Sequence, residues 1–217
     1  MLHGSSGPGI AGSELIPLLS GLARAPAAAA RPAFAARLGG WLDWTGAIAL
    51  AEALGAAAPA PATAIALAEV EADCARLRAA LEAAIDRAAP APTGADADFG
   101  PYRRHCRACQ QAMQEGIAAL RRRLRGALAQ RTPALARLAA IDAVLERALA
   151  ARERELLARV PLLLQAHFER LQGAAGAPGE HRQAYIDEQR RVLRAELEHR
   201  MLPARGLLDT LLLSEST

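Results

Sequence analysis

The sequence predicts an all-α fold with a small N-terminal helical head and an elongated antiparallel bundle of long, coiled-coil-like helices. Three observations indicate this. Apolar residues in the long segments recur at steps of three, four and seven, the spacing of an amphipathic helix. No segment alternates apolar and polar residues as a half-buried strand does. Apolar residues make up 52% of the chain but aromatic residues only 3%, so the core must be built from leucine and alanine.

The head is predicted to occupy the N-terminal quarter of the chain. Residues 1–12 are rich in glycine and serine and are predicted to be disordered. The head itself spans residues 13–55 and begins at Ser13, whose hydroxyl can cap a short helix. Two more short helices are expected to meet near Gly39 and Gly40.

The only two tryptophans of the chain, Trp41 and Trp44, lie in the head and share one helical face with Ile48. The sequence leaves two interpretations of this face open. In the first, the tryptophans form the packed core of the head. In the second, Trp41, Asp43 and Trp44 form an exposed surface that docks a protein partner, because aromatic side chains supply much of the binding energy of interfaces.

Residues 63–217 are predicted to form the bundle, after a Pro/Ala linker at residues 56–62. Thr63 is expected to cap its first helix. Pro203 is expected to end the last long helix and to precede a short final one. The long helices are expected at residues 63–87, 101–130, 132–172 and 180–201.

The segment at residues 132–172 has the clearest helix signals. Thr132 can cap its first turn, and Pro133 stands at the first helical position, where its missing N–H costs nothing. Pro161 removes the hydrogen bond to the Leu157 carbonyl. We therefore expect either a kink at Pro161 or two helices in succession.

Composition excludes several classes of enzyme. The chain contains no lysine, and its 26 residues of the Lys/Arg class are all arginine. It therefore has neither a Walker A phosphate loop nor a lysine that could form a Schiff base. Serines occur only near the two ends, and the G-x-S-x-G nucleophile motif is absent. We therefore predict no catalytic residue and no cofactor.

Two short motifs resemble parts of metal sites. His105, Cys106 and Cys109 form HCRAC, but a zinc site needs a second ligand pair at matching spacing, which the sequence does not supply. Both cysteines fall on the apolar stripe of their predicted helix, so we expect them in the core. Glu196 and His199 form a Glu-x-x-His step, but a bundle di-metal site needs a second such step. No metal ligand is predicted.

The helix predicted at residues 101–130 carries a strong local excess of basic charge. Between Pro101 and Arg131 there are eight arginines and one acidic residue, a net charge of +7, while the remaining 18 arginines and 22 acidic residues sum to −4. A helical wheel places four of the arginines within about 40° of one another, on a ridge roughly 30 Å long. This arginine ridge consists of Arg103, Arg107, Arg121 and Arg125. The predicted nucleic-acid-binding residues are Arg103, Arg104, Arg107, Arg121, Arg122 and Arg125.

Three interpretations of these arginines remain open. They pair with acidic residues of neighbouring helices, they bind an acidic protein partner, or they bind the phosphates of a nucleic acid. The absence of interleaved aromatic residues disfavours stacking on single strands and favours contacts with a duplex backbone.

The predicted location is the cytoplasm, without direct insertion into a membrane. The chain has no run of eighteen uncharged apolar residues, and its first fifteen residues lack the basic and apolar regions of a signal peptide. Three cysteines, an odd number, fit a reducing compartment.

Three segments resemble a proteobacterial family known as a domain of unknown function: RLGGWLDWTGAIAL (37–50), FGPYRRHCRACQQAM (99–113) and LAAIDAVLERALAARERELL (138–157). The Trp-Leu-Asp-Trp-Thr stretch at 41–45 is the most specific of these matches. The resemblance implies a small helical accessory subunit of the third type of Zorya antiphage system, encoded beside stator-like and OmpA-type inner-membrane proteins. It implies no catalytic residues.

The favoured function is a non-enzymatic cytoplasmic interaction subunit of an antiphage complex, working with a stator-like membrane motor. Its expected partners are proteins, including other subunits of the defence system. The alternative is a sequence-nonspecific DNA-binding effector that uses the arginines of residues 101–130. Heptad-like seams also permit a homo-oligomer.

Overall fold

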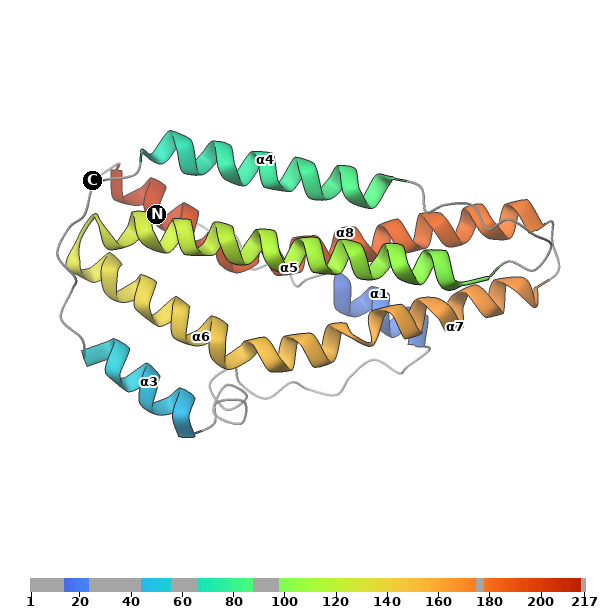
Figure 1. Ribbon diagram of the computed structural model, residues 1–217, viewed down its shortest axis with the longest axis horizontal. Coiled ribbons are helices and arrows are strands. Elements are labelled where there is room, and N and C mark those ends of the chain that lie inside the picture. Colours follow the sequence, from blue (N-terminus) through green and yellow to red (C-terminus); the bar gives the residue numbers. More distant parts are fainter. Residues whose placement is uncertain (1–13, 24–43, 56–65, 88–97, 175–177, 216–217) are drawn as a thin grey trace, which may run out of the picture.

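The fold is all-α, as predicted. The computed structural model describes residues 14–23, 44–55, 66–87, 98–174 and 178–215, and no strand occurs among them (Figure 1). The helices are α1 (Leu15–Ala23), α3 (Trp44–Gly55), α4 (Leu67–Asp86), α5 (Gly100–Ala129), α6 (Pro133–Leu157), α7 (Val160–Gln172) and α8 (Pro178–Glu215).

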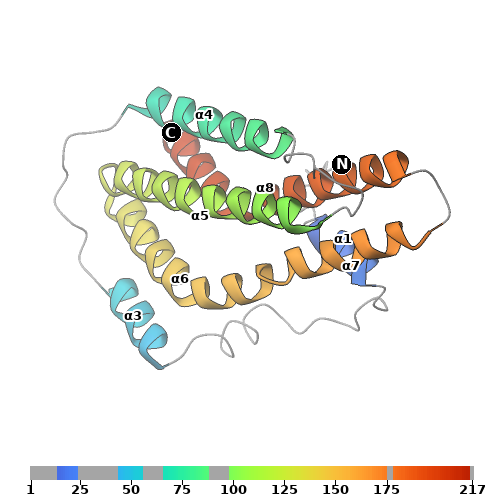
Figure 2. The ribbon, with the colours of Figure 1, turned by 45° about the vertical axis from the view of Figure 1, so that its right-hand side comes forward.

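Helix α5 lies at the centre of the bundle and packs against α4, α6, α7 and α8. Figures 1 and 2 show α4 on one side of α5 and the consecutive helices α6 and α7 on the other. Helix α8 also contacts α4 and α7. The predicted bundle of long helices is therefore present, with α5 in contact with four other helices.

The apolar stripe of α5 explains this central position. Its residues recur at helical spacing and are almost entirely inaccessible to solvent, which removes their apolar area from water. The predicted placement of the two cysteines in the core is confirmed. The stripe contains Cys106, Cys109, Met113, Ile117, Leu120, Leu124 and Leu128.

Gly116 of α5 lies directly against Leu77 of α4. A Cβ atom at that position would lie 2.6 Å from Cδ1 of Leu77. The missing side chain therefore leaves the space that the Leu77 side chain fills, and a larger residue would force Leu77 to shift.

The segment at residues 132–172 forms two helices rather than one kinked helix. Thr132 caps α6 as predicted, because its hydroxyl accepts a hydrogen bond from the Leu135 amide at 3.3 Å. Helix α6 ends at Leu157, and α7 begins at Val160 with Pro161 in its first turn. A proline in the first turn loses no intrahelical hydrogen bond, so Pro161 fits the start of α7.

The expected break at Pro203 was wrong, because α8 continues through this residue to Glu215. Pro203 cannot donate to the His199 carbonyl, which costs stability in a helix interior. Packing compensates for this loss: Met201, Ala204 and Leu207 on both sides of the proline are all buried. The continuous apolar face holds the helix together against the local preference of proline.

An aromatic cluster joins α5, α7 and α8 at the end of the bundle where α5 begins. The rings of Tyr102 and Tyr185 are 4.9 Å apart, and Phe168 lies 5.1 Å from Tyr185 and 5.6 Å from Phe99. Tilted and edge-on pairs at these separations stabilise a core beyond their area alone. Four of the seven Phe, Trp and Tyr residues of the chain thus meet at one helix junction.

The described helices of the predicted head pack on different parts of the bundle. Helix α1 packs against α7 and α8, while α3 packs against α6 (Figure 2). Gly39, Gly40, Trp41 and Asp43 lie outside the described residues, as do residues 1–12 and 56–62. The division into head, linker and bundle therefore stays a prediction.

The first bundle helix starts later than expected. Helix α4 begins at Leu67, and the preceding Ala66 provides no side-chain cap. Thr63, the predicted cap, lies outside the described residues.

Candidate functional site

Half of the predicted arginine ridge forms ion pairs inside the bundle. Arg121 donates to Asp142 of α6 at 2.6 Å, and Arg125 donates to Asp142 at 2.8 Å and to Glu146 at 2.7 Å. The two arginine side chains are only 12% and 13% exposed. Burial lowers the pKa of Arg125, but its hydrogen bonds to Asp142 and Glu146 outweigh this and raise the pKa overall. Both arginines therefore hold α5 against α6.

Two further arginines of the same segment pair with other helices. Arg123 lies 2.7 Å from Asp73 of α4, and Arg131, just after α5, lies 2.5 Å from Glu215 of α8. Arg103, Arg104, Arg107 and Arg122 are exposed, and none forms an ion pair with another described residue. The basic segment thus divides into four arginines that stabilise the bundle and four that face solvent.

Helix α3 exposes an apolar face to solvent. Its less exposed residues are Gly46, Ala49, Leu50 and Ala53, which fall on one side of the helix. The opposite side, the outer face of α3, spans an arc of about 120°. It consists of Trp44, Ala47, Ile48, Ala51 and Leu54, all exposed.

The outer face of α3 contains the predicted docking residue Trp44, which is 81% exposed. Ile48 is 43% and Leu54 is 53% exposed. The only charged residue of the helix, Glu52, lies just beside this face. An exposed, uncharged apolar face on a short helix is typical of a surface that a partner covers.

The two cysteines of the HCRAC motif are buried in the apolar stripe of α5 and are poorly placed for thiolate chemistry, whereas Arg107 between them is exposed. Burial raises the pKa of the Cys106 and Cys109 thiols, so both stay protonated at neutral pH. Cys109 Sγ lies 3.7 Å from His105 Nε2. Among the residues that the structure describes, no three His, Cys, Asp or Glu side chains form a group that could hold a metal ion.

A buried polar network lies between α5, α6 and α8, and sequence reasoning missed it. Glu196 is fully buried and accepts hydrogen bonds from Gln110 at 3.0 Å and Arg200 at 2.9 Å. Arg200 also reaches Glu153 at 3.3 Å, and Gln110 donates to the Leu157 carbonyl at 3.1 Å. Burial raises the pKa of Glu196 despite the opposing effect of Arg200 and Gln110. The detectable signal was a glutamate placed between apolar residues that recur at helical spacing.

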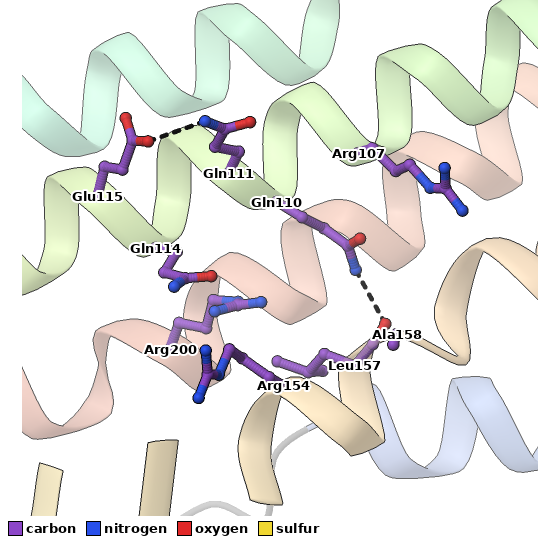
Figure 3. Close-up of a pocket in the computed structure, with 9 residues that line it drawn as sticks. All are labelled: Arg107, Gln110, Gln111, Gln114, Glu115, Arg154, Leu157, Ala158 and Arg200. Carbon is purple, nitrogen blue, oxygen red and sulfur yellow. Dashed lines mark hydrogen bonds between the residues drawn. The ribbon is translucent and has the colours of Figure 1, made fainter. Parts of the chain in front are cut away.

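This network borders an open hollow of about 390 Å³ at the junction of α5, α8 and the end of α6 (Figure 3). Arginine and glutamine side chains dominate its lining. The lining residues are Arg107, Gln110, Gln111, Gln114, Glu115, Arg154, Leu157, Ala158 and Arg200. The arrangement offers many hydrogen-bond donors and no nucleophile with an adjacent base.

A family described as "Protein of unknown function (DUF3348)" matches residues 1–212 of the chain. The chain belongs to this family. The predicted resemblance is thereby confirmed at the level of a family of unknown function, while the link to antiphage defence stays a prediction. No curated protein and no solved structure shows significant similarity to this DUF3348 chain.

None of the described helices of this DUF3348 chain is both long enough and apolar enough to cross a membrane.

Proposed function

We propose that the chain is a non-enzymatic interaction subunit that binds a protein partner through the outer face of α3. The observation that carries this proposal is that the Trp44 side chain is 81% exposed, although the other side of its helix packs against α6. A tryptophan covered by a partner contributes a large share of the binding energy, typically about 2 kcal/mol or more.

The chemistry of the face identifies the kind of partner. The side chains of Trp44, Ile48 and Leu54 carry no charge. Because they stand on a helix, their backbone groups are not free to pair with an added strand, as those at a sheet edge are. A matching partner therefore offers an apolar groove or an apolar helix face, as in helix-in-groove recognition. The resemblance to a Zorya accessory subunit supports a partner within an antiphage complex, and we propose a cytoplasmic region of the membrane motor or another defence subunit.

The arginines of α5 support this function over DNA binding. Arg121 and Arg125, half of the ridge, are occupied by Asp142 and Glu146 and are nearly buried. Their positive charge is therefore offset within the bundle and is unavailable for phosphates.

DNA binding remains the second proposed function because Arg103, Arg104, Arg107 and Arg122 are exposed. Changing these four arginines to glutamine tests it in duplex binding measured as a function of salt. Loss of binding together with a shallower salt dependence supports the DNA-binding function, since each phosphate contact contributes to the salt slope.

Co-purification from the native cells tests the protein-interaction function. Tagged wild-type protein, Trp44→Asp and the control Ala80→Asp are expressed at native level, and recovered proteins are quantified by mass spectrometry. Ala80 is exposed on α4, so the control makes the same charge change away from α3. We expect one protein to be recovered with wild type and Ala80→Asp but lost with Trp44→Asp. Equal recovery with all three would rule out the outer face of α3 as the binding surface.

A further inference from the structure

The hollow at the junction of α5, α6 and α8 is rich in unused hydrogen-bond donors. Arg107 and Gln114 make no hydrogen bond or ion pair with another described residue. Arg154 uses only its Nε, which donates to its own helix at Ala150 at 3.2 Å, so its terminal nitrogens are available. Glu115, the only acidic residue in the lining, already accepts a hydrogen bond from Gln111 at 2.9 Å.

Arg200 is fixed in place at the floor of the hollow. Its side chain is 9% exposed and is held by Glu196 at 2.8 Å and Glu153 at 3.3 Å. Three of its five N–H groups are engaged there, which leaves two for a ligand. Arg200 is thus paired with two carboxylates, so the guanidinium groups of the hollow that have no carboxylate partner are those of Arg107 and Arg154.

Gln110 donates a hydrogen bond to a backbone carbonyl that would otherwise repel an anion. The carbonyl of Leu157 lies at the end of α6, where free carbonyls repel negative charge. The Gln110 amide donates to this carbonyl at 3.1 Å. Figure 3 shows this contact and shows Gln114, Arg154 and Arg200 gathered on one side of the hollow, with Arg107 farther along α5.

We propose that this hollow binds the phosphate group of a small polar molecule. Donors reach it from three helices, so a tetrahedral group with oxygens in several directions satisfies more of them than a planar carboxylate does. Gln114, Arg154 and Arg200 contact the phosphate, and the rest of the ligand extends toward Arg107. The volume of about 390 Å³ exceeds that of one phosphate, and no aromatic residue lines the hollow to stack on a base.

Isothermal titration calorimetry with sodium pyrophosphate tests the proposal, in a low-salt buffer free of phosphate. The variants are Arg154→Gln and the double change Arg107→Gln with Arg154→Gln. The control is Arg122→Gln, which removes the same charge from an exposed position on α5 outside the hollow. The altered side chains are exposed, and circular dichroism melting curves verify that each variant folds.

Pyrophosphate is expected to bind wild type and Arg122→Gln alike. Arg154→Gln should weaken binding about tenfold or more, and the double variant further, because a hydrogen bond to a charged group contributes at least about 1.5 kcal/mol. No heat with wild type, unchanged binding by Arg154→Gln, or equal weakening by Arg122→Gln would each overturn the proposal.

A second titration with a duplex of twenty base pairs distinguishes the source of the phosphate. If pyrophosphate does not bind but the duplex binds and Arg154→Gln weakens that binding, the proposal of a small-molecule ligand is wrong. The hollow would then bind the phosphates of a nucleic-acid backbone. The outer face of α3 plays no part in these titrations, so their outcome is independent of the proposed protein interaction.

Discussion

Removal of Arg200 is expected to destabilise the protein far more than removal of Arg200 and Glu196 together. Glu196 is 0% and Arg200 is 9% exposed, so each has left water almost completely. In Arg200→Met the buried carboxylate keeps only the Gln110 amide as a partner. Breaking a buried pair in this way costs about 3–5 kcal/mol of the free energy of unfolding at pH 7.

The double variant Glu196→Leu with Arg200→Met removes the buried charge as well as its partner. Replacing a buried ion pair by apolar side chains of similar size is often neutral or stabilising. We expect the double variant to be at least about 2 kcal/mol more stable than Arg200→Met, although Gln110 loses one acceptor. The difference between the two variants isolates the cost of the unpaired carboxylate.

Urea unfolding followed by circular dichroism at 222 nm measures both variants. Arg191→Met serves as the control, because Arg191 is 66% exposed and lies 3.8 Å from Glu188 on the same helix. Its loss should change the free energy of unfolding by less than about 1 kcal/mol. A loss of the same small size in Arg200→Met, or a double variant less stable than Arg200→Met, would refute the reasoning.

Three further predictions concern helix α8 and the glycines. Burial raises the pKa of Glu196, so the stability it contributes is fully present below the ordinary glutamate pKa and is lost as pH rises through the raised value. Urea titrations over a pH series should therefore show wild type losing stability relative to Glu196→Gln with rising pH, and a constant difference would contradict this. Pro203→Ala should raise the free energy of unfolding by about 1–3 kcal/mol, since it restores a helical N–H; an unchanged urea midpoint would argue against an unbroken α8. Gly206→Ala should stabilise by up to about 1 kcal/mol because nothing lies within 4 Å of its new Cβ. Gly116→Ala should melt at a lower temperature than Gly206→Ala, because its Cβ forces the Leu77 side chain to shift and this offsets the gain in helix propensity; equal thermal melting of the two variants would contradict the close contact of α4 and α5.

Local signals in the sequence were sufficient for the helices of the bundle. The cap at Thr132, the apolar stripe of α5 and the interruption near Pro161 each depend on neighbouring residues along the chain, and all three are present in the structure. Pro203 could not be predicted in the same way, because its helix is maintained by contacts of α8 with other helices.

The candidate sites depend on how the helices are aligned in space, which spacing along the chain does not reveal. Arg121 and Arg125 are largely buried because Asp142 lies opposite them on α6. Pairing with acidic residues of neighbouring helices was one of the three interpretations of the α5 arginines that the sequence left open. Glu196 pairs with Arg200 on its own helix and with Gln110 of α5, and the contact with α5 is not visible in the spacing of residues, so its buried role was hidden. Trp44 was predicted as a candidate docking residue from its type and a packed core was left open beside it, and only the structure shows that its side chain is exposed.

Site-specific photo-crosslinking from the outer face of α3 tests the central claim most directly. Ile48→p-benzoylphenylalanine places a reactive group on this face, and Ala80→p-benzoylphenylalanine places it on the exposed side of α4. Irradiation of native cells is expected to join one partner protein to position 48 but not to position 80, and Trp44→Asp should abolish the product. A crosslinked pattern identical at both positions would contradict the claim that this face binds a partner, and a product containing only a second copy of this chain would replace that partner with a homo-oligomer.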